Sequence, residues 1–248
     1  YFTAQKAPIA LDIPIGMYYP WYNHTYGYAV RPPVKNPILT DTVSQFWIWR
    51  NRAVLNLKSG QEVTWNPYSL SGYNMSSWFH TILYSPLNIY YYFFSVVDAM
   101  SLVVITQVFI SLLGTFLFAK TIFKSNLTGM FVSVSWSLTS YFVGWLTWGT
   151  VSFALSLLPT TLYFWEKSHN GDNHRRYRVG ALLSLISLIL SGHPQTTAYT
   201  LLILITWAAY KLRSLNAVMD IVLATLVCLP LIFPSFDIIR NSIRSLEN

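Results

Sequence analysis

The sequence predicts an all-α protein that crosses a membrane several times and carries a large polar segment on one side. Hydrophobic residues make up 53% of the chain and charged residues only 10%, whereas soluble domains carry about 25% charged residues. From residue 99 onward, apolar segments alternate with short loops. Basic residues are concentrated in every second loop, as in the cytoplasmic loops of membrane proteins. A soluble globular domain is therefore not expected.

Residues 1–98 form the first expected region, an external loop region with short interfacial helices. The region is rich in Tyr, Trp, Pro and Asn and contains most of the turn signals. Asp41 opens a helical pattern whose tryptophans and basic side chains are typical of a helix lying on a bilayer surface. An aspartate at this place can be a helix N-cap, and capping does not exclude a catalytic role.

Residues 99–236 form the second expected region, a transmembrane part of about six crossings. Residues 99–119 carry no charge and have about the length needed to cross a hydrocarbon core. Several further segments are shorter than the roughly 20 residues that a perpendicular crossing needs, so tight packing, local thinning or partial re-entry would have to accommodate them. Residues 237–248 would begin the next external segment. The further crossings are expected at 127–144, 150–165, 179–191, 195–210 and 217–234.

The distribution of Lys and Arg over the loops predicts the orientation. The loops after the first, third and fifth crossings hold eight basic residues, whereas the intervening loops 145–149 and 191–195 hold none. This asymmetry places the basic loops in the cytoplasm. Residues 1–98 and the turn 191–195 then face the same extracytoplasmic side, because long loops translocate largely regardless of their charge. The eight basic residues are Lys120, Lys124, Lys167, Arg175, Arg176, Arg178, Lys211 and Arg213.

Four motifs follow one another in an order that resembles a known family. They are Asp41 with Gln45, SGQEVTWNPYSLSGY at 59–73, SPLN at 85–88 and SGHPQTTAY at 191–199. In these motifs the chain resembles YfhO-like bacterial membrane proteins, which belong to the GT-C superfamily of polyprenyl-phosphate-sugar-dependent glycosyltransferases. The resemblance covers nearly the whole chain, with one departure at Asn74, near which the family often has a proline. It implies a GT-C-like helical bundle in a bacterial plasma membrane. The chain is expected to be a fragment lacking the family's first helix and its C-terminal part.

The resemblance also implies an activity and a set of site residues. Such proteins transfer a sugar from a polyprenyl-phosphate carrier to an extracytoplasmic glycopolymer or glycolipid acceptor, with an acidic residue of the first external loop at the reaction centre. Asp41 is the matching position, and its carboxylate would take the proton of the acceptor hydroxyl. Arginine suits bidentate phosphate contacts, and a protonated histidine would also donate to the phosphate. The residues expected to bind substrate are Arg50, Arg52, His193, Gln195, Gln45, Asn66 and Tyr68.

Other interpretations of these residues stay open. His193 and Gln195 can simply form a polar turn that meets water and headgroups, and the aromatic residues can form an interfacial belt. The catalytic hypothesis requires Asp41 and the turn around His193 to border one cavity at the external face. The alternatives to an enzyme are a non-catalytic lipid-carrier flippase or transporter, which ionisable residues in mid-membrane would favour, and a degenerate GT-C scaffold.

Cofactors stay undetermined, and the expected partners are lipids and carbohydrates. Many GT-C enzymes hold a divalent cation with several carboxylates, but the acids of the first region form no DxD motif or adjacent pair. A metal site is therefore possible without any clear ligand spacing. The scattered basic residues form no stripe typical of nucleic-acid binding. The partners are a polyprenyl-phosphate-linked sugar, membrane lipids and an envelope glycopolymer or glycolipid acceptor, with no nucleic acid.

Overall fold

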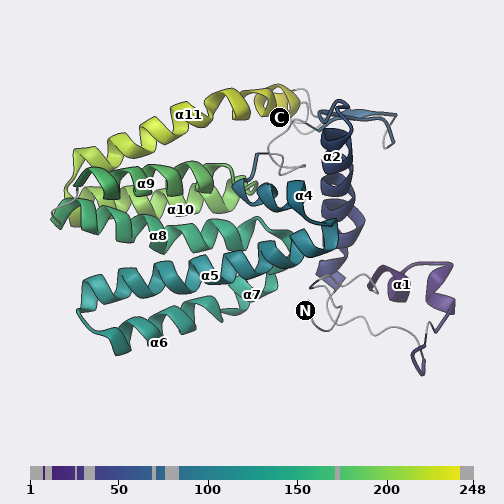
Figure 1. The fold of residues 1–248 in the computed structure, drawn as a ribbon, viewed down its shortest axis with the longest axis horizontal. Coiled ribbons are helices and arrows are strands. Elements are labelled where there is room, and N and C mark those ends of the chain that lie inside the picture. The colour runs from purple at the N-terminus through teal and green to yellow at the C-terminus, as the bar shows by residue number, and fades with distance from the viewer. Residues whose placement is uncertain are drawn as a thin grey trace.

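Long helices lie side by side in a bundle, and helix α2 stands across one end of it (Figure 1). This computed structural model describes residues 8, 13–25, 27–30, 37–68, 71–75, 84–170 and 174–240. The elements of the bundle are α5 (Val96–Phe123), α6 (Asn126–Ser137), α7 (Ser140–Gly144), η6 (Leu146–Trp148), α8 (Val151–Asn170), α9 (His174–Ile189), α10 (Pro194–Thr206), η7 (Trp207–Leu212) and α11 (Leu215–Arg240).

Shorter elements make up the described part of the chain before the bundle. They are α1 (Ile13–Met17), η2 (Trp21–Asn23), η3 (Pro37–Leu39), η4 (Thr42–Trp47), α2 (Ile48–Lys58), β1 (Trp65–Asn66), β2 (Tyr73–Asn74), η5 (Pro86–Asn88) and α4 (Ile89–Phe93). The only strands in the described ranges are β1 and β2, which pair antiparallel over two residues each. The all-α class expected from the sequence is therefore confirmed.

The apolar segments expected as crossings coincide with helices of the bundle, with one interruption. Segment 127–144 is divided into α6 and α7, because the helix stops at Leu138 and Thr139. The hydroxyl of Thr139 accepts a hydrogen bond from the backbone N–H of Phe142 at 3.4 Å and so caps α7. Helix α6 is only about 18 Å long at 1.5 Å per residue, against a hydrocarbon core of about 30 Å. Residues 127–144 are therefore not one continuous helix.

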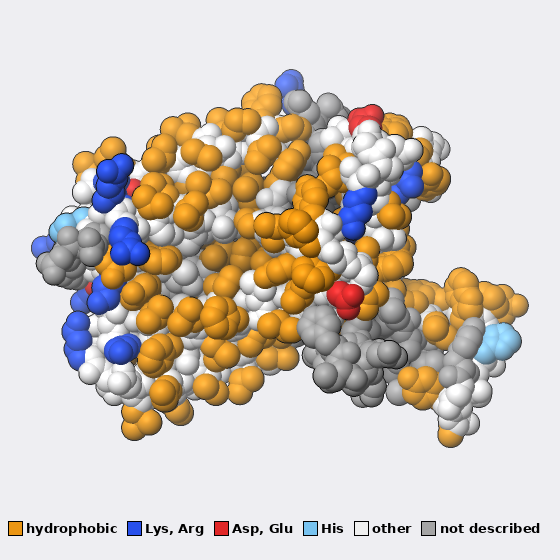
Figure 2. Space-filling model, in the orientation of Figure 1, with side chains coloured by type: hydrophobic (Ala, Val, Ile, Leu, Met, Phe, Trp, Pro, Cys, Tyr) orange, Lys and Arg blue, Asp and Glu red, His pale blue; other side chains and the backbone are white. Residues whose placement is uncertain are grey.

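Two helices of the bundle, Val96–Phe123 and Leu215–Phe236, are long and apolar enough to cross a membrane. Large apolar side chains project from both: Phe109 is 62% exposed and Phe233 is 61% exposed. Figure 2 shows hydrophobic side chains covering the visible flank of the bundle between its two ends. Soluble monomers rarely expose apolar surface this extensive. These features support association with a membrane.

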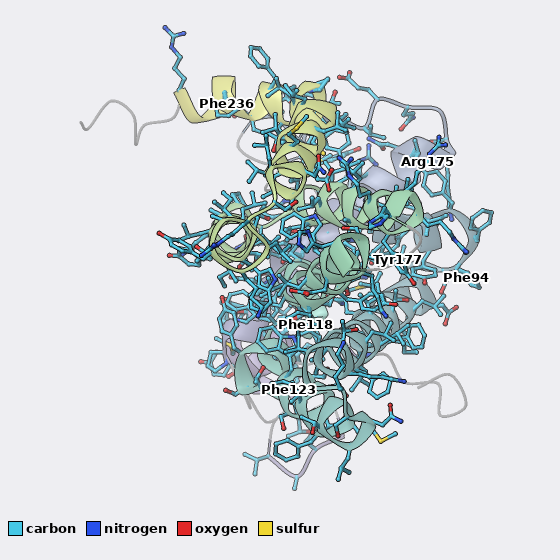
Figure 3. The ribbon with its side chains drawn as sticks, turned by 90° about the vertical axis from the view of Figure 1, so that its left-hand side faces the viewer. Phe94, Phe118, Phe123, Arg175, Tyr177 and Phe236 are labelled. Atoms are coloured by element: carbon cyan, nitrogen blue, oxygen red, sulfur yellow. The ribbon has the colours of Figure 1, made fainter. Side chains whose placement is uncertain are left out.

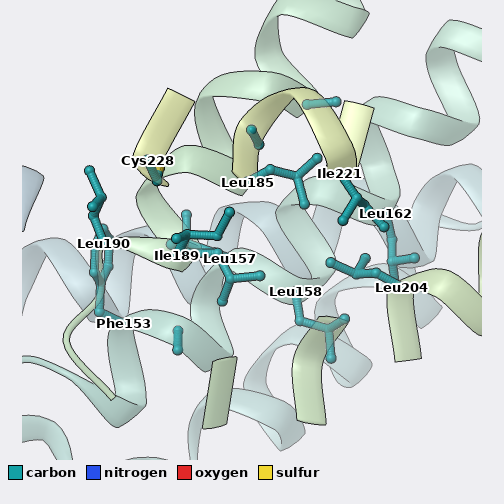
Figure 4. Packing of buried hydrophobic residues seen from close by; sticks show 14 of the residues in the cluster. Phe153, Leu157, Leu158, Leu162, Leu185, Ile189, Leu190, Leu204, Ile221 and Cys228 are labelled. Carbon is teal, nitrogen blue, oxygen red and sulfur yellow. The ribbon is translucent and has the colours of Figure 1, made fainter. Parts of the chain in front are cut away.

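Helix α8 forms the centre of the bundle, where it packs against α5, α9 and α10. Its contact with α5 is unusually close, because a Cβ atom on Gly114 would lie 2.1 Å from the side-chain oxygen of Thr160. Small residues at helix contacts are typical of packing within membranes. The buried cluster around α8 includes Phe153, Leu157, Leu158, Leu162, Leu185, Ile189, Leu190, Leu204, Ile221 and Cys228 (Figure 4).

The turns of the bundle gather at two ends of opposite composition. The C-terminal ends of α5, α8 and η7 lie at one end, where Lys and Arg side chains concentrate (left in Figure 2). Figure 3 looks onto this end, which carries Arg175 and Tyr177. The uncharged turns before α8 and α10 lie at the other end, next to α2. The alternation of basic and uncharged loops in the sequence thus corresponds to the two ends of one bundle.

Candidate functional site

Helix α2 carries a buried arginine that has only neutral partners among the described residues. Arg50 is 3% exposed. Its Nη1 donates to the hydroxyl of Tyr91 at 2.9 Å, and its Nη2 donates to the carbonyl oxygen of Trp148 at 3.1 Å. Within the described ranges no carboxylate lies at ion-pair distance from Arg50, and its Nε has no hydrogen-bond partner there. A buried charge is costly unless it is paired, so Arg50 is a candidate for binding an anion.

Tyr91 stays a neutral acceptor for this arginine. Burial raises the pKa of the Tyr91 hydroxyl above its ordinary value of 10.0, and the nearby Arg50 acts in the opposite direction. The guanidinium carbon also lies 5.3 Å from the centroid of the Tyr91 ring, a distance at which the ring face attracts a cation. The tyrosine therefore orients Arg50 without neutralising it.

The turn at Gly149 fits closely against the guanidinium. Gly149 has a φ of +71°, and a Cβ atom there would lie 3.3 Å from Nη2 of Arg50 and 3.1 Å from Cγ1 of Val103. Glycine adopts this left-handed conformation without steric cost, unlike residues with a side chain. The glycine therefore lets the carbonyl of Trp148 reach Arg50.

A small cavity of about 30 Å³ opens beside Arg50. Its cationic and polar lining comes from Arg50, Lys58 and Asn88, and its remaining wall is aliphatic and aromatic. The volume holds about two water molecules, so a phosphate oxygen fits inside but a sugar ring does not. The other lining residues are Ala53, Val54, Leu57, Tyr91 and Tyr92.

Asp41 lies exposed at the start of the same helical segment. Its side chain makes no capping hydrogen bond to η4, so the N-cap interpretation does not describe this structure. Its Oδ1 accepts a hydrogen bond from Nε2 of Gln45 at 3.4 Å. Asp41 precedes Arg50 by nine residues of helix, which is about 13 Å along the axis. The carboxylate is thus accessible, oriented by an amide and separate from the buried cation.

Arg52, Tyr68 and Asn66 form a second group next to α2. Nη2 of Arg52 donates to the Tyr68 hydroxyl at 3.2 Å, and its guanidinium carbon lies 4.6 Å from the centroid of that ring. Tyr68 is 73% exposed. Asn66 is buried, and its Oδ1 accepts the backbone N–H of Tyr68 at 3.0 Å. Asn66 therefore shapes the turn that presents Tyr68, while Arg52 and Tyr68 form the accessible surface.

His193 caps helix α10 in its neutral form. Its Nδ1 accepts the backbone N–H of Thr196 at 3.2 Å and lies 2.8 Å from the Thr196 hydroxyl. Burial lowers the pKa of His193 from its ordinary value of 6.5. The proton of the neutral ring is consequently on Nε2, which is the atom that can donate to a ligand. Gln195 is exposed, and its Nε2 donates to the hydroxyl of Tyr199 at 3.0 Å.

Two tryptophans connect the surroundings of Arg50 with His193. The ring of Trp145 lies 4.6 Å from that of Trp148 and 6.2 Å from that of His193, measured between centroids. Segment η4 also contacts η6. The structure therefore brings the sequence-predicted residues to one end of the bundle. The cavity beside Arg50, however, is lined by neither Asp41 nor His193, so it is not the shared cavity that the sequence hypothesis requires.

Several residues of this site were not predicted from the sequence. Lys58 and Asn88 line the cavity, while Tyr91, Trp148 and Gly149 hold Arg50 in place. Asn88 belongs to the SPLN motif, so the motif could have identified it as a candidate. Lys58 lies about two turns after Arg50 on the same helix α2. Tyr91, Trp148 and Gly149 are separated from Arg50 by tens of residues, so only the folded chain brings them together.

In the described part of the chain, no group of three or more His, Cys, Asp or Glu side chains could hold a metal ion. No protein-family model, no curated protein and no solved structure matches the chain.

Proposed function

We propose that the chain belongs to a multi-pass membrane glycosyltransferase that moves a sugar from a polyprenyl-phosphate carrier to an extracytoplasmic glycopolymer or glycolipid. The observation that carries the proposal is the buried cation of Arg50, which has only neutral partners in the described structure and borders a cavity shared with Lys58. An anionic group of a ligand is the natural complement of such a cation.

The lining of the cavity favours a phosphate attached to an apolar chain. Arg50 and Lys58 provide two positive charges, and Val54 and Leu57 provide aliphatic contact beside them. The cavity itself admits only a phosphate oxygen, but Leu57 beside it is 42% exposed. The first units of an isoprenoid would bury apolar area against this side chain from outside, whereas a free nucleotide would gain little there. In sugar transfer the leaving phosphate gains negative charge, and preorganised cations stabilise that charge.

The acid in this proposal is Asp41. Its exposed carboxylate would accept the proton of the acceptor hydroxyl as the hydroxyl attacks the sugar carbon. Gln45 donates to one carboxylate oxygen and leaves the other for the acceptor. The donor phosphate and the base would then lie along one helix, with the sugar between them.

The bundle supports the multi-pass topology of the proposal. Helices α5 and α11 have the length and composition of membrane-spanning helices, and the helices packed between them share the same two ends. We place the basic end in the cytoplasm, as the distribution of positive charge favours. Helix α2, Asp41 and His193 would then face the outside of the cell.

Sugar transfer tests the activity directly. The purified protein, reconstituted in liposomes, would be incubated with radiolabelled polyprenyl-phosphate sugars and envelope extract, and label in the glycopolymer or glycolipid fraction would be measured. Asp41→Asn should abolish transfer while membrane abundance stays normal. Glu62→Gln, which changes another exposed acid of the same segment, is the matched control and should retain transfer. Transfer by Asp41→Asn at the wild-type rate, or no transfer of any labelled sugar by the wild type, would refute the proposal.

Cysteine labelling tests the topology independently. In a Cys228→Ser background, Tyr68→Cys should react with a membrane-impermeant maleimide on intact cells. Arg175→Cys, at the opposite end of the bundle, should react only after permeabilisation. Labelling of both positions from the same side would contradict the proposed orientation.

A further inference from the structure

The basic end of the bundle contains a second polar cavity, far from Arg50. Its volume is about 320 Å³, which is large enough for a phosphate group with several of its substituent atoms. It lies where the C-terminal end of α8 meets the first turns of α9 and α11. The lining residues are Trp165, Ser168, His169, His174, Arg178, Ser214, Asn216, Ala217 and Asp220.

The one carboxylate in this lining is fully engaged. Oδ1 of Asp220 accepts hydrogen bonds from Nη2 of Arg178 at 2.7 Å and from its Nε at 3.3 Å. Oδ2 of Asp220 accepts the indole N–H of Trp165 at 3.3 Å. Asp220 is 1% exposed, and the Arg178 side chain is 39% exposed. The pair therefore fixes Arg178 at the cavity wall while cancelling the acidic charge.

Further basic residues are close to the cavity lining in the sequence. Lys167, Arg175 and Arg213 directly adjoin the lining residues Ser168, His174 and Ser214 in sequence. The ion pair at this cavity joins Arg178 and Asp220, and it does not involve these rim cations. Figure 2 shows Lys and Arg side chains gathered at this end, and Figure 3 labels Arg175 there. This end of the bundle therefore carries an excess of positive charge, which attracts anions.

Two long helices also direct their N-terminal ends at this cavity. Helix α9 begins at His174 and α11 at Leu215, and residues of both first turns belong to the lining. The N-terminal end of a helix carries a partial positive charge and backbone N–H groups that bind anions. Nδ1 of His174 donates to the carbonyl oxygen of Ser168, so Nε2 of this ring donates to an anion only when the ring carries a second proton.

We propose that this cavity is a binding site for a phosphate group, separate from the proposed sugar-transfer site and at the opposite end of the bundle. Arg178, held by Asp220, and the N-terminal turns of α9 and α11 form the site, and the rim cations attract the anion to it. The phosphate belongs either to the headgroup of an acidic phospholipid or to a small soluble anion.

Binding of two probes tests the site. Inorganic phosphate would be titrated into the detergent-purified protein at constant ionic strength, with chloride as reference, and the shift in melting temperature would give its dissociation constant. Retention of phosphatidylglycerol would be measured by mass spectrometry, after reconstitution in nanodiscs of equal parts phosphatidylglycerol and phosphatidylcholine. A response to phosphate alone identifies a soluble anion as the ligand, and selective retention of phosphatidylglycerol alone identifies the headgroup.

Three variants distinguish binding in the cavity from non-specific binding to the basic surface. Arg178→Gln/Asp220→Asn replaces the ion pair by neutral amides of similar shape, so it leaves no buried carboxylate unpaired. Asn216→Trp blocks the cavity without changing its charge. Each should weaken binding of the responding probe about tenfold or more, since hydrogen bonds to charged groups are strong. Lys120→Gln removes one charge at the same end away from the cavity, and it should change affinity less than about twofold. Binding of neither probe, or equal losses in all three variants, would overturn the proposal.

Discussion

Replacing Arg50 with methionine tests whether its buried charge stabilises the fold or binds a ligand, because the two roles predict different changes in stability and in phosphate affinity. The arginine donates two charged hydrogen bonds, each of which contributes about 1.5–3 kcal/mol, so their loss costs about 3–6 kcal/mol. Removing an ion from a buried position also releases a desolvation penalty of several kcal/mol. Because the two effects oppose each other, the free energy of unfolding of Arg50→Met should change by less than about 2 kcal/mol.

Affinity for the donor phosphate should respond much more strongly than stability. Removing one partner of a desolvated charge pair costs about 2–5 kcal/mol, which corresponds to at least about 30-fold weaker binding. Chemical denaturation in detergent would measure the first quantity, and isothermal titration calorimetry with a short-chain polyprenyl phosphate the second. Tyr91→Phe leaves the charge in place and removes one of its acceptors, so it should destabilise the protein by about 1–3 kcal/mol. If Arg50→Met bound the phosphate like the wild type and lost about 3–5 kcal/mol of stability, Arg50 would be a structural residue.

Three further perturbations test the site and the helix bundle that carries it. Gly149→Ala places a side chain in a left-handed conformation and against the guanidinium of Arg50. It should lower the free energy of unfolding by about 1–2 kcal/mol and weaken phosphate binding. Unchanged stability and unchanged binding would show that the glycine is not needed to position Arg50. Gly114→Val brings a side chain into Thr160 and should destabilise the bundle by about 1–3 kcal/mol in thermal unfolding, with an unchanged melting temperature arguing against the close α5–α8 contact. Burial lowers the pKa of His193, so the unfolded chain binds more protons than the folded chain just below pH 6.5. The contribution of His193 to the free energy of unfolding should therefore be fully present above that pH and decrease as the pH drops. Melting temperatures between pH 5 and 7.5 measure this effect, and His193→Asn, which keeps a capping acceptor, should remove that part of the slope.

Hydrophobic pattern and charge distribution were sufficient to predict most of the bundle. The apolar segments, separated by short loops, coincide with helices. In a helix the backbone hydrogen bonds are made within the segment itself, as an apolar surrounding requires. The interruption at Leu138 and Thr139 was not predicted. A hydrophobicity pattern does not register a single hydrogen bond such as the one with which Thr139 caps α7. The opposite composition of the two ends follows directly from the alternation of basic and uncharged loops.

The site was predictable only in part. Arg50 and His193 were identified as candidates from their residue types and side of the membrane, and they do lie at one end of the bundle. The burial of Arg50, its neutral partners and the role of Gly149 depend on contacts across the fold, which one sequence cannot supply. Asp220 illustrates the same limit, since it is buried against Arg178 and Trp165, which are distant in the sequence.

The most direct measurement of the central claim is an experimental structure of the protein in a nanodisc, bound to a short-chain polyprenyl-phosphate sugar. We expect phosphate density at hydrogen-bonding distance, about 3 Å, from the guanidinium of Arg50, with the sugar between that group and Asp41. Phosphate density away from Arg50, with the cavity beside α2 still empty at saturating donor, would contradict the claim.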